Sequence, residues 1–191
     1  MKILRIDFED EKARITISMT RPFNTSEKPH LARGLFRLLP RLKKHRCYND
    51  GNLTFQREAA CTEIAHLMEH LVLELQAVTL CGRGIRGVTY WNWKEEPTGC
   101  FHVDVDAPHP GVALGAVALA WRIIRAVDAR HPESINIEQE LRTLRTIAAL
   151  PPAAFPTAPV LDFERWEEEW TGQVAHLVGA PPGPTLAGVP G

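Results

Sequence analysis

The sequence lacks several features that would place a protein in a large functional class. Its 191 residues carry 22 Lys and Arg against 23 Asp and Glu, and this net charge of −1 gives no overall attraction to nucleic acid or to an anionic membrane. No apolar run approaches the roughly 18 residues that span a bilayer. The first residues have charges inside their apolar run and no small-residue cleavage site, unlike a signal peptide. We therefore expect a cytoplasmic protein without nucleic-acid or membrane partners.

Cysteine is also scarce, and a phosphate-binding motif is missing. The four cysteines are scattered without a Cys-x-x-Cys pair, which argues against a cysteine zinc finger and against a disulfide framework. We expect them to be small buried residues, although one thiol could serve as a soft metal ligand. No Gly-x-x-x-x-Gly-Lys-[Ser/Thr] segment occurs, so nothing indicates ATP binding.

The pattern of apolar residues predicts one α+β domain. With 45% hydrophobic and 24% charged residues, a chain of this length suits a single globular core. Alternation of apolar and polar residues predicts an antiparallel pair over 2–19, a hairpin over 87–106 and a short strand at 53–56. Helical periodicity covers 26–43, 58–80, 111–130 and 135–149. We expect an antiparallel sheet with helices packed on one face.

Residues 151–191 differ in composition from the domain expected over 1–150. They are rich in Pro, Ala and Gly, and we expect a tail that is largely disordered or loosely docked. An acidic and aromatic element at 161–170 interrupts this composition. It could bind a partner, but packing on the domain is the simpler expectation.

The helix predicted over 58–80 carries nearly all the chemistry that the sequence offers. It contains His66-x-x-Glu69-His70, the inverted form of the zincin motif, in which two histidines bind zinc and the glutamate takes a proton from the zinc-bound water. Apolar residues at spacings of three and four place this helix in the core layer. His66 and His70 are one turn apart on the same face and can reach one cation. Glu74, four residues past His70, could accept its second N–H as an outer partner.

A third metal ligand has to come from elsewhere in the chain. The strand predicted at 100–106 has an apolar face and a polar face, and such a polar face is usually exposed to solvent. If it turns toward the motif helix instead, Asp106, Asp104 or His102 could complete the coordination. We take Asp106 as the candidate, with Glu74 as the competing choice.

Charged residues in two turns are candidates for substrate binding. Arg83 and Arg86 lie in a glycine-rich loop at 81–87, where they could hold a carboxylate, although such loops are more often plain connectors. Glu95 and Glu96, in the turn of the predicted hairpin, or acids of the tail could meet guanidinium groups.

Over residues 1 to about 150 the sequence resembles the N-terminal domain of cyanophycin synthetase. The most specific match is the run His66-x-x-Glu69-His70-Leu71-Val72-Leu73-Glu74-Leu75-Gln76, and weaker matches lie at 34–40, 45–47 (His-x-Cys), 82–87, 99–106 and 138–141. The resemblance implies a domain that binds cyanophycin, a poly-aspartate with arginine on each side chain. The resemblance also implies a metallopeptidase-like site, which in many members of the family cuts the polymer into primers.

The sequence departs from the family pattern in four ways. The large ATP-grasp and ligase domains that make the polymer are absent, so we expect no polymer synthesis by this chain alone. Asp106 stands where the family has Glu. The Gly-Gly-Phe segment that precedes the motif helix in the family is here Asn52-Leu53-Thr54-Phe55, and the usual Gly-Thr is Ala60-Cys61-Thr62.

The resulting hypothesis is a zinc-dependent hydrolase of an amide bond in a cyanophycin-like polymer or a related peptide. His66, His70 and Asp106 would be the ligands, Glu69 the base, and Arg83 and Arg86 contacts for the substrate. The alternative is a metal-free domain that binds the polymer or docks onto separate synthetase subunits. A metal-dependent enzyme acting on an unrelated small molecule is a third alternative.

Overall fold

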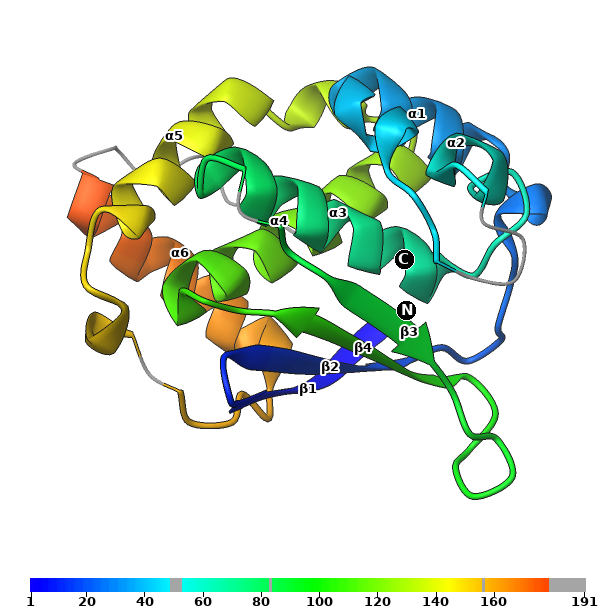
Figure 1. The fold of residues 1–191 in the computed structure, drawn as a ribbon, viewed down its shortest axis with the longest axis horizontal. Helices are drawn as coiled ribbons and strands as arrows, with labels where there is room; N and C mark the ends of the chain where they lie inside the picture. The colour runs from blue at the N-terminus through cyan, green and yellow to red at the C-terminus, as the bar shows by residue number, and fades with distance from the viewer. Residues whose placement is uncertain (49–52, 83, 156, 179–191) are drawn as a thin grey trace, which may run out of the picture.

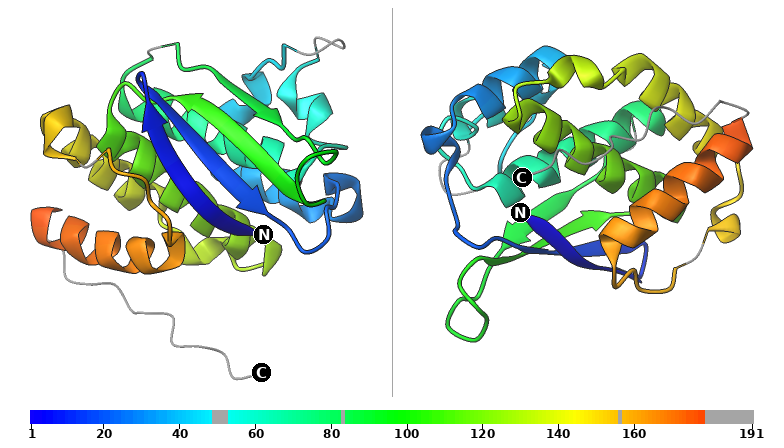
Figure 2. Two further views of the ribbon diagram at one scale, coloured as in Figure 1. Left: turned by 90° about the horizontal axis from the view of Figure 1, so that it is seen from below. Right: turned by 180° about the vertical axis from the view of Figure 1, so that it is seen from behind.

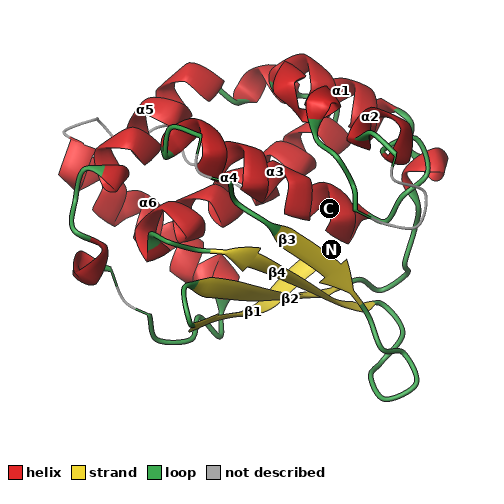
Figure 3. Cartoon of the chain, viewed as in Figure 1, coloured by secondary structure: helices red, strands yellow, loops and turns green. Residues whose placement is uncertain are grey.

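A four-stranded antiparallel sheet carries helices on one face (Figures 1 and 3). The strands are β1 (Lys2–Glu9), β2 (Lys12–Ser18), β3 (Gly87–Tyr90) and β4 (Cys100–Asp106), in the order β1-β2-β4-β3. The computed structural model describes residues 1–48, 53–82, 84–155 and 157–178. The predicted α+β class and antiparallel sheet are confirmed.

Alternation along the strands decides which face of the sheet the helices cover. Every second residue of β2 and β4 is buried on the helix side: Ala13, Ile15, Ile17, Phe101, Val103 and Val105. The residues between them lie on the outer face, where Arg14 and Asp104 form a bidentate ion pair at 2.8 Å. The polar face of β4 is therefore turned away from the helices.

Helices α3 (Ile64–Thr79) and α4 (Pro110–Asp128) form the core layer over the sheet. α3 lies on β3 and β4 and packs against α4. By length and composition α4 could cross a membrane, but 78% of its apolar window is buried inside the fold, as in a core helix of a globular domain. α3 is buried around most of its circumference, and even its polar residues Glu69, His70, Glu74 and Gln76 are at most 5% exposed.

Two of the predicted helical segments are shorter or divided in the structure, and α3 begins at Ile64, six residues after the start of the predicted range 58–80. The segment 26–43 splits into a 3-10 turn (Thr25–Glu27), α1 (His30–Leu38) and a second 3-10 turn (Pro40–Lys44), because a proline cannot continue a helix. The strand expected at 53–56 is a single bridge between Arg46 and Thr54, followed by α2 (Phe55–Glu58). α5 (Ile137–Ala148) agrees closely with the predicted range 135–149.

The segment after residue 150 packs on the domain through residue 172, apart from residue 156, which lies outside the described residues (Figure 2). Val160 and Ile6 exchange backbone hydrogen bonds of 2.9 Å, and α6 (Phe163–Val178) buries Phe163 and Trp170 in the core. The aromatic residues of α6 share one helical face, which gives the helix an apolar stripe to bury. The described part of this segment is thus docked on the domain, and residues 179–191 lie outside the described residues.

Candidate metal centre

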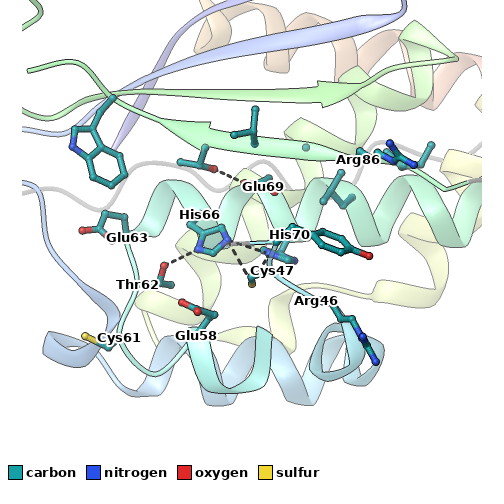
Figure 4. Close-up of a pocket in the computed structure, with 17 residues that line it drawn as sticks. Arg46, Cys47, Glu58, Cys61, Thr62, Glu63, His66, Glu69, His70 and Arg86 are labelled. Atoms are coloured by element: carbon teal, nitrogen blue, oxygen red, sulfur yellow. Dashed lines mark hydrogen bonds between the residues drawn. The ribbon is translucent and has the colours of Figure 1, made fainter. Parts of the chain in front are cut away.

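The motif helix presents its histidines to a cavity of about 870 Å³. The cavity lies between α3, strand β3, the segment around Cys47 and the residues that lead into α3 (Figure 4). His66, Glu69 and His70 all line it. The motif therefore opens onto a cavity, although most of α3 is buried.

Three ligand atoms converge in this cavity. The Nε2 atoms of His66 and His70 are 3.1 Å apart, and the Sγ of Cys47 lies 3.8 Å from the first and 3.4 Å from the second. Ligand atoms around a tetrahedral zinc ion, with Zn–N of about 2.0–2.1 Å and Zn–S of about 2.3 Å, lie roughly 3.3–3.6 Å from one another. The set is two imidazoles and one thiol, which suits zinc, and three protein ligands leave a fourth position for water or substrate.

The outer nitrogen of each histidine already has a partner. His66 Nδ1 lies 2.7 Å from the Thr62 hydroxyl, and His70 Nδ1 lies 3.1 Å from His45 Nδ1. His45 Nε2 in turn lies 2.9 Å from Glu74 Oε2. One set of tautomers satisfies all of these contacts: His66 donates to Thr62, His70 to His45, and His45 to Glu74. This arrangement leaves two Nε2 lone pairs facing each other, which a cation between them would stabilise.

Local packing fixes the orientation of these rings. Phe55 stacks on His70 with centroids 3.8 Å apart and an interplanar angle of 18°. Backbone hydrogen bonds from Cys47 N–H to the Leu53 carbonyl and from Phe55 N–H to the His45 carbonyl tie the cysteine segment to the start of α2. The Cys47 thiol and the His70 ring are thus positioned by the same pairing between the cysteine segment and the start of α2. A metal site requires this kind of preorganisation.

Burial sets the protonation of the three candidate ligands. It lowers the pKa of His66, and burial together with the neighbouring His66 and His45 lowers the pKa of His70 to about 2. Both rings are therefore neutral at pH 7, the form that binds metal. Burial, with Glu58 and Glu69 nearby, raises the pKa of the Cys47 thiol to about 12, so without a cation the thiol stays protonated at pH 7. A bound cation would deprotonate it.

Glu69 lies in the same cavity and is 5% exposed. Thr89, on β3, donates a hydrogen bond of 2.6 Å from its hydroxyl to Glu69 Oε2. Burial raises the pKa of Glu69 despite this hydrogen bond. The carboxyl group thus lines the same cavity as the histidine pair and is more basic than an exposed glutamate, which suits a proton acceptor.

The structure separates Asp106 from the histidines, and this corrects its choice as third ligand. Asp106 Oδ2 accepts a hydrogen bond of 2.9 Å from the Arg86 backbone N–H, at the end of a strand whose polar residues face away from α3. Among the described residues, the ligand atoms grouped with His66 and His70 belong to Cys47. The apolar face of β4 must pack under α3, so its acids lie on the other side.

The other predicted site residues have mixed outcomes. Glu74 is buried but contacts His45 and, at 3.4 Å, Arg41, so it reaches His70 only through His45. Arg86 lines the cavity. Arg83 lies outside the described residues. Glu95 and Glu96 bind Asn92 and His102 in the hairpin and do not line the cavity.

Sequence reasoning did not place Cys47 and His45 beside the motif histidines. Both lie in a segment without helical or strand periodicity, so no local sequence pattern predicts that they contact α3. The His-x-Cys match to the cyanophycin synthetase domain at 45–47 was the available indication, together with the possibility that one cysteine is a metal ligand. Neither indication identified which of the four cysteines lies beside the histidines.

The charged residues on the cavity wall are segregated. Glu58 and Glu63 lie toward the end of the cavity where α3 begins, and Arg46 and Arg86 lie toward the opposite end (Figure 4). The histidine pair lies between the two groups. A ligand that carries both a cationic and an anionic group would complement this arrangement.

Comparison with known proteins gives one family assignment. The family model described as the cyanophycin synthase-like N-terminal domain matches residues 12–128, more than half of the chain, and this span includes β2, β4, α3 and the whole cluster of Cys47, His66 and His70. A comparison with curated proteins finds no match. The chain belongs to the cyanophycin synthase-like N-terminal domain family.

Proposed function

We propose that this protein is a zinc-dependent hydrolase that cuts an amide bond in a cyanophycin-like polymer or a related Asp/Arg peptide. The observation that carries the proposal is the convergence of Cys47, His66 and His70 in a cavity that also holds the buried carboxyl group of Glu69. Zinc bound by these three residues would supply a Lewis acid that lowers the pKa of water toward about 7.

The protein's own groups would then move the proton and hold the ligands. Glu69, fixed by the Thr89 hydroxyl, takes the proton from the attacking water and passes it to the leaving amine. Its raised pKa favours this double role, because the group must accept a proton and also release it. Thr62 and the pair of His45 and Glu74 keep Nε2 of each motif histidine free to coordinate.

The charges on the cavity wall support the substrate class. An arginine attached through its α-amine to an aspartate side chain keeps a guanidinium group and a free carboxylate. Glu58 and Glu63 could meet the first, and Arg46 and Arg86 the second, on opposite sides of the histidine pair. A substrate of one charge sign would leave half of this complementarity unused.

A hydrolysis assay tests the proposal. Cyanophycin and short β-aspartyl-arginine peptides are incubated with the zinc-loaded protein, with protein stripped by a chelator, and with stripped protein to which zinc is returned. We expect new amino termini only when zinc is present. Glu69→Gln should retain zinc and lose about 10²- to 10⁴-fold in rate, the usual contribution of a positioned acid-base group.

Matched controls separate the outcomes. Glu133→Gln removes an exposed carboxylate outside the cavity and should leave the rate unchanged. A Glu69→Gln variant with full activity would eliminate Glu69 as the base. Zinc-loaded protein that binds the polymer without cutting it would instead support the alternative, a polymer-binding domain that docks onto separate synthetase subunits.

A further inference from the structure

Strand β3 is the edge strand at the rim of the cavity. The strand order β1-β2-β4-β3 leaves one side of β3 without a strand neighbour within the described part of the chain. Gly87, Val88 and Thr89 also line the cavity that holds His66 and His70. The open side of an edge strand carries unpaired backbone N–H and C=O groups that can pair with another chain.

The register shows which backbone groups lie on the open side. The Asp106 N–H donates to the Arg86 carbonyl at 2.8 Å, so residues 86 and 106 form a hydrogen-bonded pair. Such pairs alternate along an antiparallel ladder, and the next ones are Val88 with Asp104 and Tyr90 with His102. The N–H and C=O groups of Gly87 and Thr89 therefore point away from β4.

These open groups lie next to the proposed base. Thr89 presents its main chain to the edge while its hydroxyl holds Glu69 at 2.6 Å. At Gly87, a Cβ atom would lie 3.1 Å from Glu69 Cγ, so the absence of a side chain allows β3 and Glu69 to approach closely. A strand paired with β3 would thus run beside the reactive groups.

We propose that the open side of β3 binds the main chain of an extended peptide substrate as an added strand, through the N–H and C=O groups of Gly87 and Thr89. Two donor-acceptor pairs two residues apart match the repeat of an extended chain, about 6.6–6.8 Å. This inference rests on the proposed function for its substrate. The inference goes further than the proposed function because it assigns recognition of the substrate main chain to β3. The charged side chains of the substrate would be recognised by the cavity wall.

A peptide fits this edge better than a second copy of the protein. The edge forms part of the cavity wall, between the acidic end at Glu63 and the basic end at Arg86. A zwitterionic Asp/Arg peptide lying along it would complement both ends. Edge-to-edge pairing of two copies is the competing occupant, and the experiments below distinguish the two.

Amide hydrogen exchange, followed by NMR, tests the inference without requiring catalysis. Zinc-loaded Glu69→Gln protein is saturated with an aspartate tetramer that carries arginine on each side chain. Exchange at Gly87 and Thr89 should slow at least about tenfold, because each N–H gains an acceptor, while Val88 and Tyr90, already bonded to β4, should change little. Unchanged exchange at Gly87 and Thr89 under saturation would overturn the proposal.

Methylation of the peptide main chain provides the matched control. When each backbone nitrogen is methylated in turn, affinity should fall at least about tenfold at every second position within the paired segment and little at the positions between. Losses without alternation would contradict strand addition. If Gly87 and Thr89 are protected without peptide and the protein is a dimer in solution, the edge belongs to a second copy and the proposal is overturned.

The two proposals fail separately. Protection and alternation in Glu69→Gln, combined with no hydrolysis by the wild type, would retain the strand-binding edge and reject the hydrolase. Zinc-dependent hydrolysis without protection at Gly87 and Thr89 would retain the hydrolase and reject the edge.

Discussion

Two clusters of side chains that could bind a metal lie on opposite faces of the β3 and β4 region. One is Cys47, His66 and His70 in the cavity on the helix side, and the other is Glu96, Cys100 and His102 on the outer side of the hairpin. In each cluster the possible ligand atoms lie within 4.8 Å of one another. By proximity alone the two would rank equally as metal sites.

The difference lies in which nitrogen of each histidine remains free. In the cavity, the Nδ1 atoms contact Thr62 and His45, so both Nε2 atoms turn toward Cys47. On the outer face, His102 Nε2 lies 2.8 and 2.9 Å from the two oxygens of Glu96, and its Nδ1 faces Thr16 at 3.4 Å. The inner cluster offers two Nε2 lone pairs, whereas in the outer cluster the Glu96 carboxylate already occupies Nε2 of His102.

A metal site is therefore identified by the groups behind its ligands as much as by the ligands. The pair of His45 and the buried Glu74 fixes one tautomer, and Thr62 fixes the other. No comparable outer partner frees His102 among the described residues. We expect the inner cluster to hold zinc and the outer cluster to contribute a modest surface interaction.

The largest expected effect is loss of zinc on changing either motif histidine. His66→Ala or His70→Ala leaves two of three protein ligands, and the bound zinc measured by elemental analysis should fall from about one per chain to near zero after dialysis. His102→Ala is the matched control in the outer cluster and should keep the wild-type content. Loss of zinc from His102→Ala instead would reverse the comparison.

A smaller loss of zinc affinity is expected when Glu74, which contacts His70 through His45, is changed. Glu74→Gln keeps the shape of the side chain but removes the charge that orients His45, and zinc affinity should fall about 10- to 100-fold, as for other outer partners of metal ligands. Competition with a fluorescent chelator measures this change. Glu63→Gln, on the cavity wall but outside the histidine network, should bind zinc like the wild type.

The metal-free protein should lose stability in acid because of the inner cluster. His70 has its pKa lowered to about 2 in the folded state, so between this value and its ordinary pKa of 6.5 the unfolded chain binds more protons. Its contribution is present above pH 6.5 and falls by about 1.4 kcal/mol per pH unit below it. Urea unfolding at several pH values should show this slope in the wild type and a correspondingly smaller one in His70→Ala.

Two neighbours complicate the absolute slope but not the difference between the variants. His66 also has a lowered pKa and acts in the same direction, while the raised pKa of Glu69 acts in the opposite direction above pH 4.5. Equal slopes in wild type and His70→Ala would show that His70 is not held neutral by burial.

The smallest effect is expected in the outer cluster. Glu96→Gln removes the charge that pairs with His102 on a partly exposed surface, and the free energy of unfolding should change by about 0–1 kcal/mol. Denaturant titration of the zinc-loaded protein measures it. A loss of several kcal/mol, or of bound zinc, would show that this cluster has a larger role than an ion pair.

The motif helix could be predicted from the sequence because the pattern that specifies it lies within a few consecutive turns. His66, Glu69 and His70 occupy one turn of a helix whose apolar period is strong, and their relative placement follows from helix geometry. The strands of the sheet followed in the same way from alternation. Both periods can be recognised without knowing what packs against them.

The third ligand that we propose, Cys47, could not be predicted from local patterns. Cys47 lies in a segment without a period. Its approach to α3 accompanies tertiary contacts that a local pattern does not show, from Cys47 to Leu53 and from Phe55 to His45 and His70. For Asp106 the necessary information was present. Phe101, Val103 and Val105 form the apolar face of β4, and an apolar face packs toward the helices, so the acids between them had to point away.

X-ray absorption at the zinc edge tests the central claim most directly. In the zinc-loaded wild type we predict one sulfur at about 2.3 Å and two imidazole nitrogens at about 2.0–2.1 Å, with the sulfur shell absent in Cys47→Ser. The same shell should persist in Cys100→Ser, the cysteine of the outer cluster. A zinc ion bound only by nitrogen and oxygen in the wild type, or a sulfur shell that disappears with Cys100→Ser, would contradict the assignment of Cys47, His66 and His70 as the metal centre.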